Sequence, residues 1–486
     1  MKEKIEIIKK IISQSLPMCS LIQVGSSTTY EKYNDIDFII ICNDSYNTKD
    51  ILKKIFNSYS ISEIDDSIKI LDYLDKEISF ALYNYNELLN MIKEYNLGHH
   101  ITAEHESWTI GYWLIEGLII DLKKGNVIID HHELSTLKRV ILKENIYGEQ
   151  RILKDCLEEI KIKSKLLEKY KPSVEENFLK QDIFLSTLRA FSIIEKKALC
   201  GFKNLNNSIS LLTAEKRVIL DKLYESNNIK KTIEIIEQSI NKLNNLYLGT
   251  WQLGGQFKNL SNDEVIKILN CSKKMGIHKF DTALVYGDGM VEKQISEVID
   301  NNDIILTKVP ARKKPNLNEV CKLEDYYSKT YIIDCVKKSI DNLKVKKINT
   351  LLLHNWHYSW DDNDEILNWL IDLKNQGIVE KIGISLPNNY NRILSKKVLC
   401  KIDVIEAPYN NENKWIEKDI DIYKQYNIEI ILRSIFLQGK LLKDDSNTYV
   451  EIIKKVLKFN TSVVIGMTTN EQIMNNVKCI SEVKND

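Results

Sequence analysis

The sequence holds little of what flexible linkers are made of, because only six Pro and 17 Gly occur among 486 residues. Long mobile connections between domains are therefore not expected. Charge of one sign is not in excess either, since 68 Lys and Arg residues balance 68 Asp and Glu residues. This neutrality argues against non-specific binding to nucleic acid or to an anionic membrane surface, both of which favour a net basic face.

Long apolar runs and paired cysteines are missing as well. No apolar stretch reaches the roughly 18 residues that a membrane span requires. Residues 1–12 alternate charged residues with Ile and do not form the apolar core of a signal peptide. Nine Cys are scattered along the chain without a Cys-x-x-Cys pair, which favours reduced, mostly buried thiols. We therefore expect a cytoplasmic protein with small-molecule partners, no membrane partner and no nucleic-acid partner.

What is present is the composition of a globular protein, with 43% hydrophobic and 28% charged residues. The pattern changes character twice along the chain. Residues 1–130 mix helices with short apolar strands, residues 131–245 look almost wholly helical, and residues 246–486 alternate strands with helices. We therefore predict an α/β multidomain protein with boundaries near residues 130 and 245.

Short apolar runs predict strands in the first segment, and apolar residues at three- and four-residue spacing predict helices in the second. The candidate strands are Leu21–Val24, Asp37–Cys42, Glu77–Leu82 and Leu118–Leu122. The candidate helices of the second segment are Ile152–Leu167, Phe178–Leu199 and Ile229–Leu243.

The third segment contains eight candidate strands with amphipathic helices between most neighbours. The strands are Leu246–Gly249, His278–Asp281, Ile304–Lys308, Thr350–His354, Lys381–Ser385, Val404–Pro408, Glu429–Arg433 and Val463–Gly466. Eight alternations in about 240 residues favour a (β/α)8 TIM barrel, because a parallel strand is followed by a crossover element. The alternative is a doubly wound open sheet, which usually has fewer strands and a Gly-rich first turn.

A Gly-Ser step and two Asp residues stand out in the first segment. Gly25 and Ser26 follow a candidate strand, and Asp35 and Asp37 stand at the head of the next. Residues two apart in a strand share a face, so the two carboxylates point the same way. Such oxygen ligands suit Mg²⁺, and the small Gly-Ser step lets N–H groups and a hydroxyl hold a triphosphate.

A third acid would complete a site for two metal ions, which activate an attacking oxygen and steady a leaving pyrophosphate. Glu77, at the head of an alternating strand, is our candidate, and Asp72 and Asp75 are close rivals. The alternative for the whole pattern is a strand edge with two solvent-facing Asp residues.

This arrangement resembles the nucleotidyltransferase superfamily, which has a helix-borne Gly-Ser, then Asp-x-Asp, then a third acid on a neighbouring strand. The resemblance covers residues 1–130 and implies that residues 131–245 form the accessory helical bundle. It also implies that Gly25 and Ser26 contact the phosphates of ATP or another NTP. In the same way it implies metal ligation by Asp35, Asp37 and Glu77.

The second constellation joins an acid, a phenol, an amine and an imidazole. Asp281, Lys308 and His354 stand at the ends of successive candidate strands, and Tyr286 follows the first of them. In a barrel these ends meet at the carboxyl edge, where barrel enzymes carry their chemistry. We expect the ammonium to lower the pKa of the phenol, so that Tyr286 protonates a carbonyl oxygen while hydride reaches the carbon. Because no side chain supplies hydride, a nicotinamide cofactor is implied.

The stretch from Phe280-Asp281-Thr282-Ala283 to Tyr286-Gly287 resembles the aldo-keto reductases, and the resemblance extends over residues 246–486. In that family an Asp, a Tyr, a Lys and a His form the catalytic tetrad, which corresponds here to Asp281, Tyr286, Lys308 and His354. The resemblance also implies residues on the cofactor side. They correspond to Gly249, Thr250, Trp251, Ser385, Glu406, Arg433, Gln438, Gly466, Thr468 and Asn476.

The chain departs from the family pattern near the expected cofactor. Leu386 stands where Asn is usual, Glu406 stands where Gln is usual, and Arg433 replaces an aromatic residue that often stacks on the nicotinamide. The family often places a Lys or Arg near the last helix to pair with the 2′-phosphate of NADPH. Here Met467-Thr468-Thr469 offers no cation, so NADPH and NADH both remain candidates.

Taken together, the two constellations predict a bifunctional enzyme. The first would carry out Mg²⁺-dependent nucleotidyl transfer to a small-molecule acceptor, and the second would reduce a carbonyl or oxidise an alcohol. One alternative is that a single module is active while the other is a binding or redox-sensing scaffold. Another is that the first module modifies a protein or RNA while the barrel senses the redox state of NAD(H).

Overall fold

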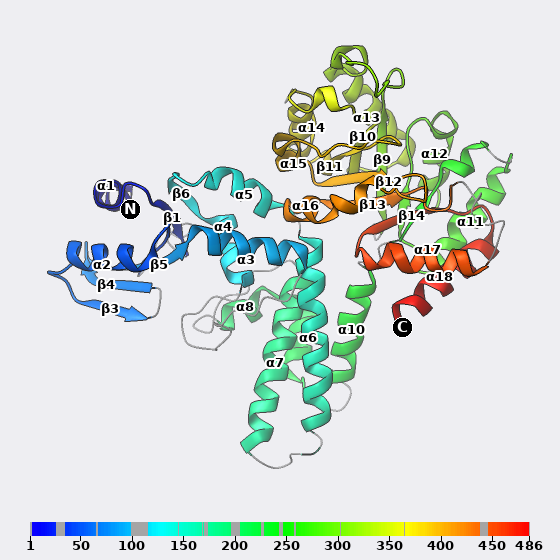
Figure 1. Ribbon diagram of the computed structural model, residues 1–486. Helices are drawn as coiled ribbons and strands as arrows, with labels where there is room; N and C mark the ends of the chain where they lie inside the picture. The colour runs from blue at the N-terminus through cyan, green and yellow to red at the C-terminus, as the bar shows by residue number, and fades with distance from the viewer. Residues whose placement is uncertain are drawn as a thin grey trace. The chain divides into compact units, whose positions relative to one another are not determined.

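The chain divides into two compact units, Met1–Leu243 and Asn244–Asp486, in the computed structural model (Figure 1). The residues described are 2–25, 35–64, 67–98, 115–143, 145–167, 169, 174–195, 205–224, 228–242, 246–256, 259–301, 303–363, 365–437 and 446–485. Among the helices in these ranges, none has both the length and the apolar character needed to cross a membrane.

The first unit is built on a six-stranded mixed sheet in the order β3-β4-β5-β2-β1-β6. Its strands are β1 (Ser20–Val24), β2 (Asp35–Cys42), β3 (Ile61–Ile64), β4 (Ser67–Tyr73), β5 (Lys76–Asn84) and β6 (Asn126–Ile129). Strand β2 lies at the centre, antiparallel to β1 and parallel to β5. Three of the four predicted strands are therefore present, as β1, β2 and β5.

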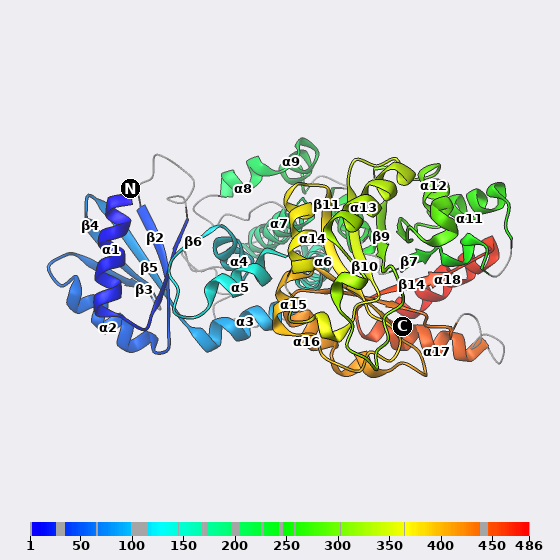
Figure 2. The ribbon, with the colours of Figure 1, turned by 90° about the horizontal axis from the view of Figure 1, so that it is seen from above.

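Each face of this sheet is covered by helices, because β2 is apolar on both faces over most of its length. Ile36, Phe38 and Ile40 pack with α1 (Lys2–Ser15) and α2 (Ser45–Ile55), and α1 lies against the strands (Figure 2). Ile39 and Ile41 point to the opposite face and pack with α3 (Tyr85–Leu97), α4 (Ile115–Lys124) and the helices beyond them. Asp44 caps α2, because its side chain accepts a hydrogen bond from the Asn47 N–H.

The predicted strand Leu118–Leu122 is wrong, because this segment lies in helix α4 (Ile115–Lys124). Leu118, Ile119 and Leu122 are buried together on one side of the helix. Their spacing of one and four residues fits the 3.6-residue period of a helix and not the alternation of a strand. A short apolar run does not distinguish the two.

Helices make up most of the other described residues of the first unit. They are α3 (Tyr85–Leu97), α5 (Leu134–Leu142), α6 (Ile146–Leu167), α7 (Val174–Ile194), α8 (Leu205–Leu211), α9 (Ala214–Asp221) and α10 (Asn228–Lys242). Helices α6 and α7 run side by side, and α10 packs against both (Figure 1). The predicted helices at 152–167, 178–199 and 229–243 coincide with α6, α7 and α10 in the described residues.

The second unit is a closed barrel of eight parallel strands, as predicted. The strands are β7 (Leu246–Gly249), β8 (Lys279–Asp281), β9 (Ile304–Pro310), β10 (Ile348–His354), β11 (Val379–Ser385), β12 (Val404–Pro408), β13 (Glu429–Arg433) and β14 (Ser462–Gly466). Strand β14 pairs with β7 and closes the ring. Closure excludes the open doubly wound sheet.

Helices surround the barrel strands, as Figure 2 shows for α13 and α14. They are α11 (Asn262–Lys274), α12 (Met290–Ser296), α13 (Lys329–Leu343), α14 (Glu365–Asn375), α15 (Lys396–Lys401), α16 (Ile420–Gln425), α17 (Ser446–Lys458) and α18 (Asn470–Asn485). Helix α11 begins with a reciprocal capping box between Ser261 and Glu264, which satisfies two terminal backbone donors.

Candidate active site

One layer of apolar side chains fills the barrel interior. The predicted site forms the next layer toward the carboxyl ends of the strands. The apolar layer consists of Tyr247, Leu306, Leu352, Val404, Ile431 and Val464. Strand side chains alternate, so the residues two positions further on point inward as well. Those residues are Gly249, Lys308, His354, Glu406, Arg433 and Gly466. All six were predicted as site residues, and they stand at the carboxyl end of the barrel.

Strand register brings Asp281 and Ser385 into the same layer. Asp281 pairs with Gly249 across β7 and β8, and Ser385 lies between His354 and Glu406 in the ladders of β10, β11 and β12. The predicted residues of all eight strand ends are thus gathered by one closed set of ladders.

Tyr286 reaches this layer from the turn after β8. It begins the short 3-10 helix η4 (Tyr286–Gly289), and its N–H donates to the Ala283 carbonyl at 2.9 Å. Gly287, Asp288 and Gly289 all have positive φ, between 52° and 84°. This is the left-handed region that Gly adopts without a steric penalty, so the two glycines allow the chain to turn directly behind Tyr286.

Lys308 lies at the centre of the polar layer and is 1% exposed. Its ammonium donates to Asp281 Oδ1 and, at 3.1 Å, to the Thr282 carbonyl. The Nζ atom also lies 5.5 Å from the centre of the Tyr286 ring. Three of the four predicted catalytic side chains are therefore in one buried group. Burial lowers the pKa of Lys308, but Asp281 and Glu406 outweigh burial, so the pKa is raised and the amine stays charged.

Tyr286 does not behave as the sequence predicts. Its side chain is buried, and burial raises the pKa of the phenol more than Lys308 lowers it. Asp281 and Glu406 raise it further, so the net shift is upward and not downward. Lys308 does act in the predicted direction, but its charge is offset by two nearby carboxylates.

Burial shifts the pKa values of His354 and Asp281 in opposite directions. Burial, together with the positive charge of Lys308, lowers the pKa of His354 to about 4, so the imidazole is neutral at neutral pH. Burial raises the pKa of Asp281 more than contact with Lys308 lowers it. The His354 carbonyl accepts a hydrogen bond from the Tyr327 hydroxyl at 2.5 Å, which fixes the end of β10.

Glu406 and Arg433 form a second charged pair beside the first. Glu406 Oε2 lies 3.4 Å from Lys308 Nζ, and Glu406 Oε1 lies 3.4 Å from Arg433 Nε. Burial raises the pKa of Glu406, but Lys308 and Arg433 outweigh burial and hold it below its ordinary value. Arg433 also donates to the Leu386 carbonyl at 2.9 Å. The Leu386 side chain itself is buried in the apolar core, where an Asn would leave an amide unpaired.

Three residues at the carboxyl end of the barrel present buried polar atoms, and only one of the three, Ser385, was predicted on the cofactor side. Thr282 Oγ1 and Gln252 Oε1 make no hydrogen bond within the described ranges, and the Ser385 hydroxyl lies beside the Glu406 carboxylate. Buried polar groups are normally paired, so these atoms fit a polar ligand such as the carboxamide of a nicotinamide. Thr250 differs, because its hydroxyl is already bonded to the Asp281 carbonyl at 2.8 Å. Trp251 is partly buried against the barrel core.

The remaining predicted cofactor residues follow β13 and β14. The Thr468 N–H and hydroxyl both bond to Gln472 Oε1, at 2.8 and 3.3 Å, at the start of α18. Asn476 is buried one turn further along that helix. Gln472 was not predicted, although its position four residues after Thr468 could have indicated it. Gln438 lies outside the described residues.

In the first unit, the structure brings the three predicted acids to one face of the sheet. Asp35 lies opposite Glu77 in the parallel pair of β2 and β5, and Asp37 lies opposite Ser79. Gly25, at φ 73°, packs so closely on Asp37 that a Cβ there would lie 2.5 Å from the carboxylate oxygen. Of the rival acids, Asp72 lies near the end of β4 and Asp75 lies in the turn between β4 and β5. Ser26 lies outside the described residues.

These acids do not yet form a metal site. The Glu77 carboxylate is 2.7 Å from Lys69 Nζ, which neutralises it. Burial, followed by the charge of Asp35, raises the pKa of Asp37 to about 6. Within the part of the chain that the structure describes, no three His, Cys, Asp or Glu side chains are placed to hold a metal ion. The residues present therefore fit Mg²⁺ incompletely.

Sequence reasoning missed one acid near this face, Asp121 of α4. Burial raises the pKa of Asp121 to about 7, and the negative charge of Asp37 adds to the rise. Its Oδ2 atom is buried and makes no hydrogen bond among the described residues. The wrong strand prediction for this segment hid Asp121, because it gave no reason to place that residue over β2.

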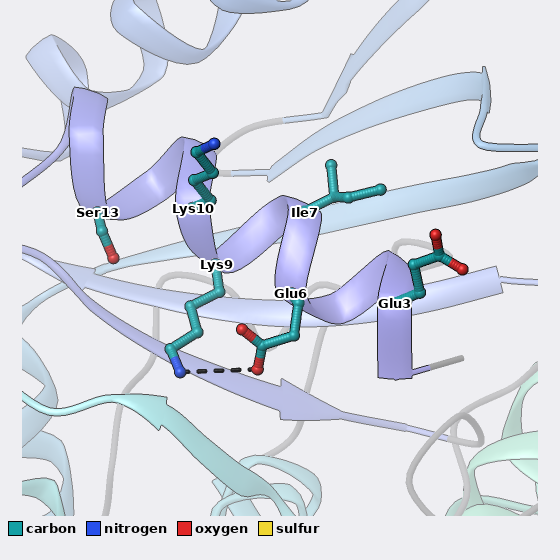
Figure 3. Close-up of a pocket in the computed structure, with 6 residues that line it drawn as sticks. All are labelled: Glu3, Glu6, Ile7, Lys9, Lys10 and Ser13. Atoms are coloured by element: carbon teal, nitrogen blue, oxygen red, sulfur yellow. Dashed lines mark ion pairs between the residues drawn. The ribbon is translucent and has the colours of Figure 1, made fainter.

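A shallow depression on α1 does not compete with these sites. It is lined by Glu3, Glu6, Ile7, Lys9, Lys10 and Ser13, all from that helix (Figure 3). Glu6 and Lys9 form an ion pair at 3.7 Å, and both side chains are substantially exposed. One face of a single helix with solvated charges provides no enclosed binding site.

The geometry defines the class of protein to which the second unit belongs. It is a (β/α)8 barrel with a buried Asp, Lys, Tyr and His at its carboxyl end. Comparison with known proteins identifies this domain, because residues 245–454 match the aldo/keto reductase family. The second unit therefore carries an aldo/keto reductase family domain.

Individual relatives are distant. The chain is 26% identical over 212 residues to the uncharacterized oxidoreductase YqkF of Bacillus subtilis, which covers 43% of this chain and 66% of that protein. It is 24% identical over 214 residues to the aldo-keto reductase dtxS3 of Metarhizium robertsii, covering 38% and 57%. The solved holo form of aldo-keto reductase AKR11C1 from Bacillus halodurans is 20% identical, with a TM-score of 0.40, over 50% of this chain and 91% of its own. The chain thus spans less than two thirds of each curated relative.

Proposed function

We propose that the barrel reduces a carbonyl compound, or oxidises the matching alcohol, with a nicotinamide cofactor. The observation that carries this proposal is the buried group of Lys308, Asp281 and Tyr286, in which the ammonium contacts the carboxylate and lies over the phenol ring. The family match of residues 245–454 supports the same reaction type.

Each side chain has a role that follows from its surroundings. Tyr286, whose pKa is raised, keeps its proton at neutral pH and can donate it to a carbonyl oxygen. Lys308 stays charged and stabilises the phenolate that this donation leaves. Asp281 holds the ammonium in place. The neutral His354 can donate or accept a hydrogen bond and so orient the carbonyl group.

The cofactor would be held along the carboxyl ends of the remaining strands. Ser385 offers a buried hydroxyl to a carboxamide, and the start of α18 offers backbone N–H groups to phosphates. When bound, the cofactor supplies hydride. No Lys or Arg occurs between residues 459 and 477, so no cation there pairs with a 2′-phosphate, which favours NADH over NADPH.

The test combines binding and turnover. Quenching of protein fluorescence would report NADH and NADPH binding, and cofactor absorbance would report turnover of a panel of aldehydes and ketones. Binding of a nicotinamide nucleotide together with turnover supports the proposal. Binding without turnover of any carbonyl or alcohol supports a redox-sensing scaffold instead, and no binding contradicts both.

A second candidate function is nucleotidyl transfer by the first unit, from ATP or another NTP with Mg²⁺ to a small molecule. The observation that favours it is the placement of Asp35, Asp37 and Glu77 on one face, with Gly25 packed against Asp37. We propose that Gly25 and Ser26 contact the triphosphate and that the three acids meet the metal. Glu77 would then have to exchange Lys69 for the cation.

Labelled nucleoside triphosphates test this candidate. The full chain is incubated with each NTP, Mg²⁺ and small acceptors that carry hydroxyl or amino groups. The double variant Asp35→Asn/Asp37→Asn is expected to abolish labelling. The matched control is Asp72→Asn/Asp75→Asn, which removes two acids from the end of β4 and the turn after it and should label acceptors as the parent does. Equal labelling by the Asp35→Asn/Asp37→Asn variant would reject the metal-site proposal.

A further inference from the structure

The Lys308 ammonium is held by two carboxylates and not by one. It contacts Asp281, and it lies 3.4 Å from Glu406 Oε2. Strands β9 and β12 are not neighbours in the barrel, so the contact with Glu406 crosses the interior. Both acids are at least 96% buried, with relative exposures of 4% and 1%. Solvent and salt therefore screen these charges only weakly.

Glu406 also links this group to a second cation. Its Oε1 atom lies 3.4 Å from Arg433 Nε, and Arg433 is the more exposed of the two side chains. The aldo-keto reductase pattern has an uncharged Gln where this chain has Glu406. This chain has therefore gained a buried negative charge between two cations, and the family pattern does not explain it.

We propose that Glu406 is a positioning residue of the reductase site, which shares Lys308 with Asp281 and limits how much of its positive charge acts on the Tyr286 hydroxyl. The inference rests on the proposed carbonyl reduction. It assigns to Glu406 a role toward the proton donor, in addition to any contact with a cofactor.

The groups that face Tyr286 and Glu406 can be named from every strand end around them. Around Tyr286 they are Asp281 of β8, Lys308 of β9, Glu406 of β12 and Arg433 of β13. Around Glu406 they are Lys308, Arg433 and His354 of β10, together with the Ser385 hydroxyl of β11. His354 is neutral at neutral pH, so two acids face two cations.

The consequence is a bias toward reduction. Burial and the two acids raise the pKa of Tyr286, whereas Lys308 and Arg433 lower it. Tyr286 therefore stays protonated, which is the form that reduction needs and that alcohol oxidation does not. An amide at position 406 would leave both cations and only one acid, so the phenol would ionise at a lower pH.

The direct test follows Tyr286 by NMR in the full chain with tyrosine labelled at ¹³Cζ. The Tyr286 signal is the one that a Tyr286→Phe variant lacks. In Glu406→Gln, we expect the acid ionisation constant of Tyr286 to rise at least tenfold. In Arg433→Met, we expect the acid ionisation constant of Tyr286 to fall. An unchanged titration in Glu406→Gln overturns the proposal, and if that variant does not fold, as judged by circular dichroism, Arg433→Met decides it.

A kinetic test uses NADH or NADPH with 4-nitrobenzaldehyde as the carbonyl probe. The pH at which reduction falls off should be lower in Glu406→Gln than in the parent, and oxidation of the matching alcohol at pH 8 should increase. Tyr390→Phe is the control, because it removes a buried hydroxyl outside the proposed site without changing charge and should leave that pH unchanged. Absence of turnover in the parent would contradict the proposed function, whereas the NMR titration tests Glu406 without substrate or cofactor.

Discussion

The Lys308 ammonium lies over the ring of Tyr286, with 5.5 Å between Nζ and the ring centre. Its hydrogen bonds go to Asp281 and to the Thr282 carbonyl. Lys308 therefore acts on the phenol through its charge, over a short path that excludes water. The effect of this charge is large at the moment when the phenol loses its proton, because a phenolate then forms beside a buried cation.

Removal of either partner should reduce turnover and spare cofactor binding. We expect Tyr286→Phe and Lys308→Met each to lower kcat by about 100-fold or more, which is the usual contribution of a positioned proton donor. Fluorescence quenching should give a Kd for NADH that is nearly the same as in the parent. Stopped-flow or steady-state absorbance of the reduced cofactor measures the loss.

Tyr390→Phe provides the control for that experiment. Tyr390 is also a buried tyrosine, but its hydroxyl makes no hydrogen bond in the described ranges, and it is not among the predicted site residues. Loss of an unpaired buried hydroxyl is close to neutral for folding. A Tyr390→Phe variant as inactive as Tyr286→Phe would show that the loss does not arise at the proposed site.

The pH profile should contain no histidine step near neutrality. The pKa of His354 is lowered to about 4, first by burial and then by Lys308. The imidazole is therefore neutral from about pH 5 upward, and its charge does not change between pH 5 and 8. If His354 is the group that governs the pH dependence, we expect kcat/KM to be constant between pH 5 and 8. A step near pH 6.5 that disappears in His354→Gln would contradict this assignment.

The sequence predicts the barrel well because strand ends and site residues coincide in it. Each predicted strand is short, and five of the eight end in a polar residue, as with Leu353 and His354, so the carboxyl edge could be recognised without coordinates. The pairing of Glu406 with Lys308 could not be predicted, because it crosses the barrel between strands that are not neighbours. Barrel closure sets that distance, and no local pattern encodes it.

In the first unit, the sequence predicts which acids share a face but not how deeply they are buried. Asp35 and Asp37 could be placed on one face from strand alternation alone. The raised pKa values of Asp37 and Asp121 depend on burial by segments remote in sequence. Local spacing predicts which residues share a face, but burial depends on what covers that face.

Stability of the first unit should fall as the pH rises from about 4 to about 7. The pKa values of Asp37 and Asp121 are raised from 3.8 to about 6 and about 7. The folded state thus binds these protons more tightly than the unfolded state does. Their stabilising contribution is complete below about pH 4 and is lost as the pH rises through the folded values.

Asp121→Asn isolates that effect. The amide carries no charge, so we expect the free energy of unfolding to exceed that of the parent by on the order of 1–2 kcal/mol at pH 8, and to differ little at pH 4. Hydrogen exchange of the β1 and β2 peptides measures the difference locally. Exchange that is faster in Asp121→Asn than in the parent at pH 8 would show that the carboxylate is stabilised by a partner.

Cofactor preference should respond to a cation placed before α18. Thr469 is exposed, and the nearest basic residues in sequence are Lys458 and Lys478. If NADPH binds with its 2′-phosphate at this end of the barrel, Thr469→Arg supplies a bidentate partner for it. We expect the Kd for NADPH to fall by about tenfold, equivalent to about 1.4 kcal/mol, while the Kd for NADH stays the same. Thr469→Gln, which has a polar side chain without charge, should change neither value, and equal tightening for both cofactors in Thr469→Arg would place the 2′-phosphate elsewhere.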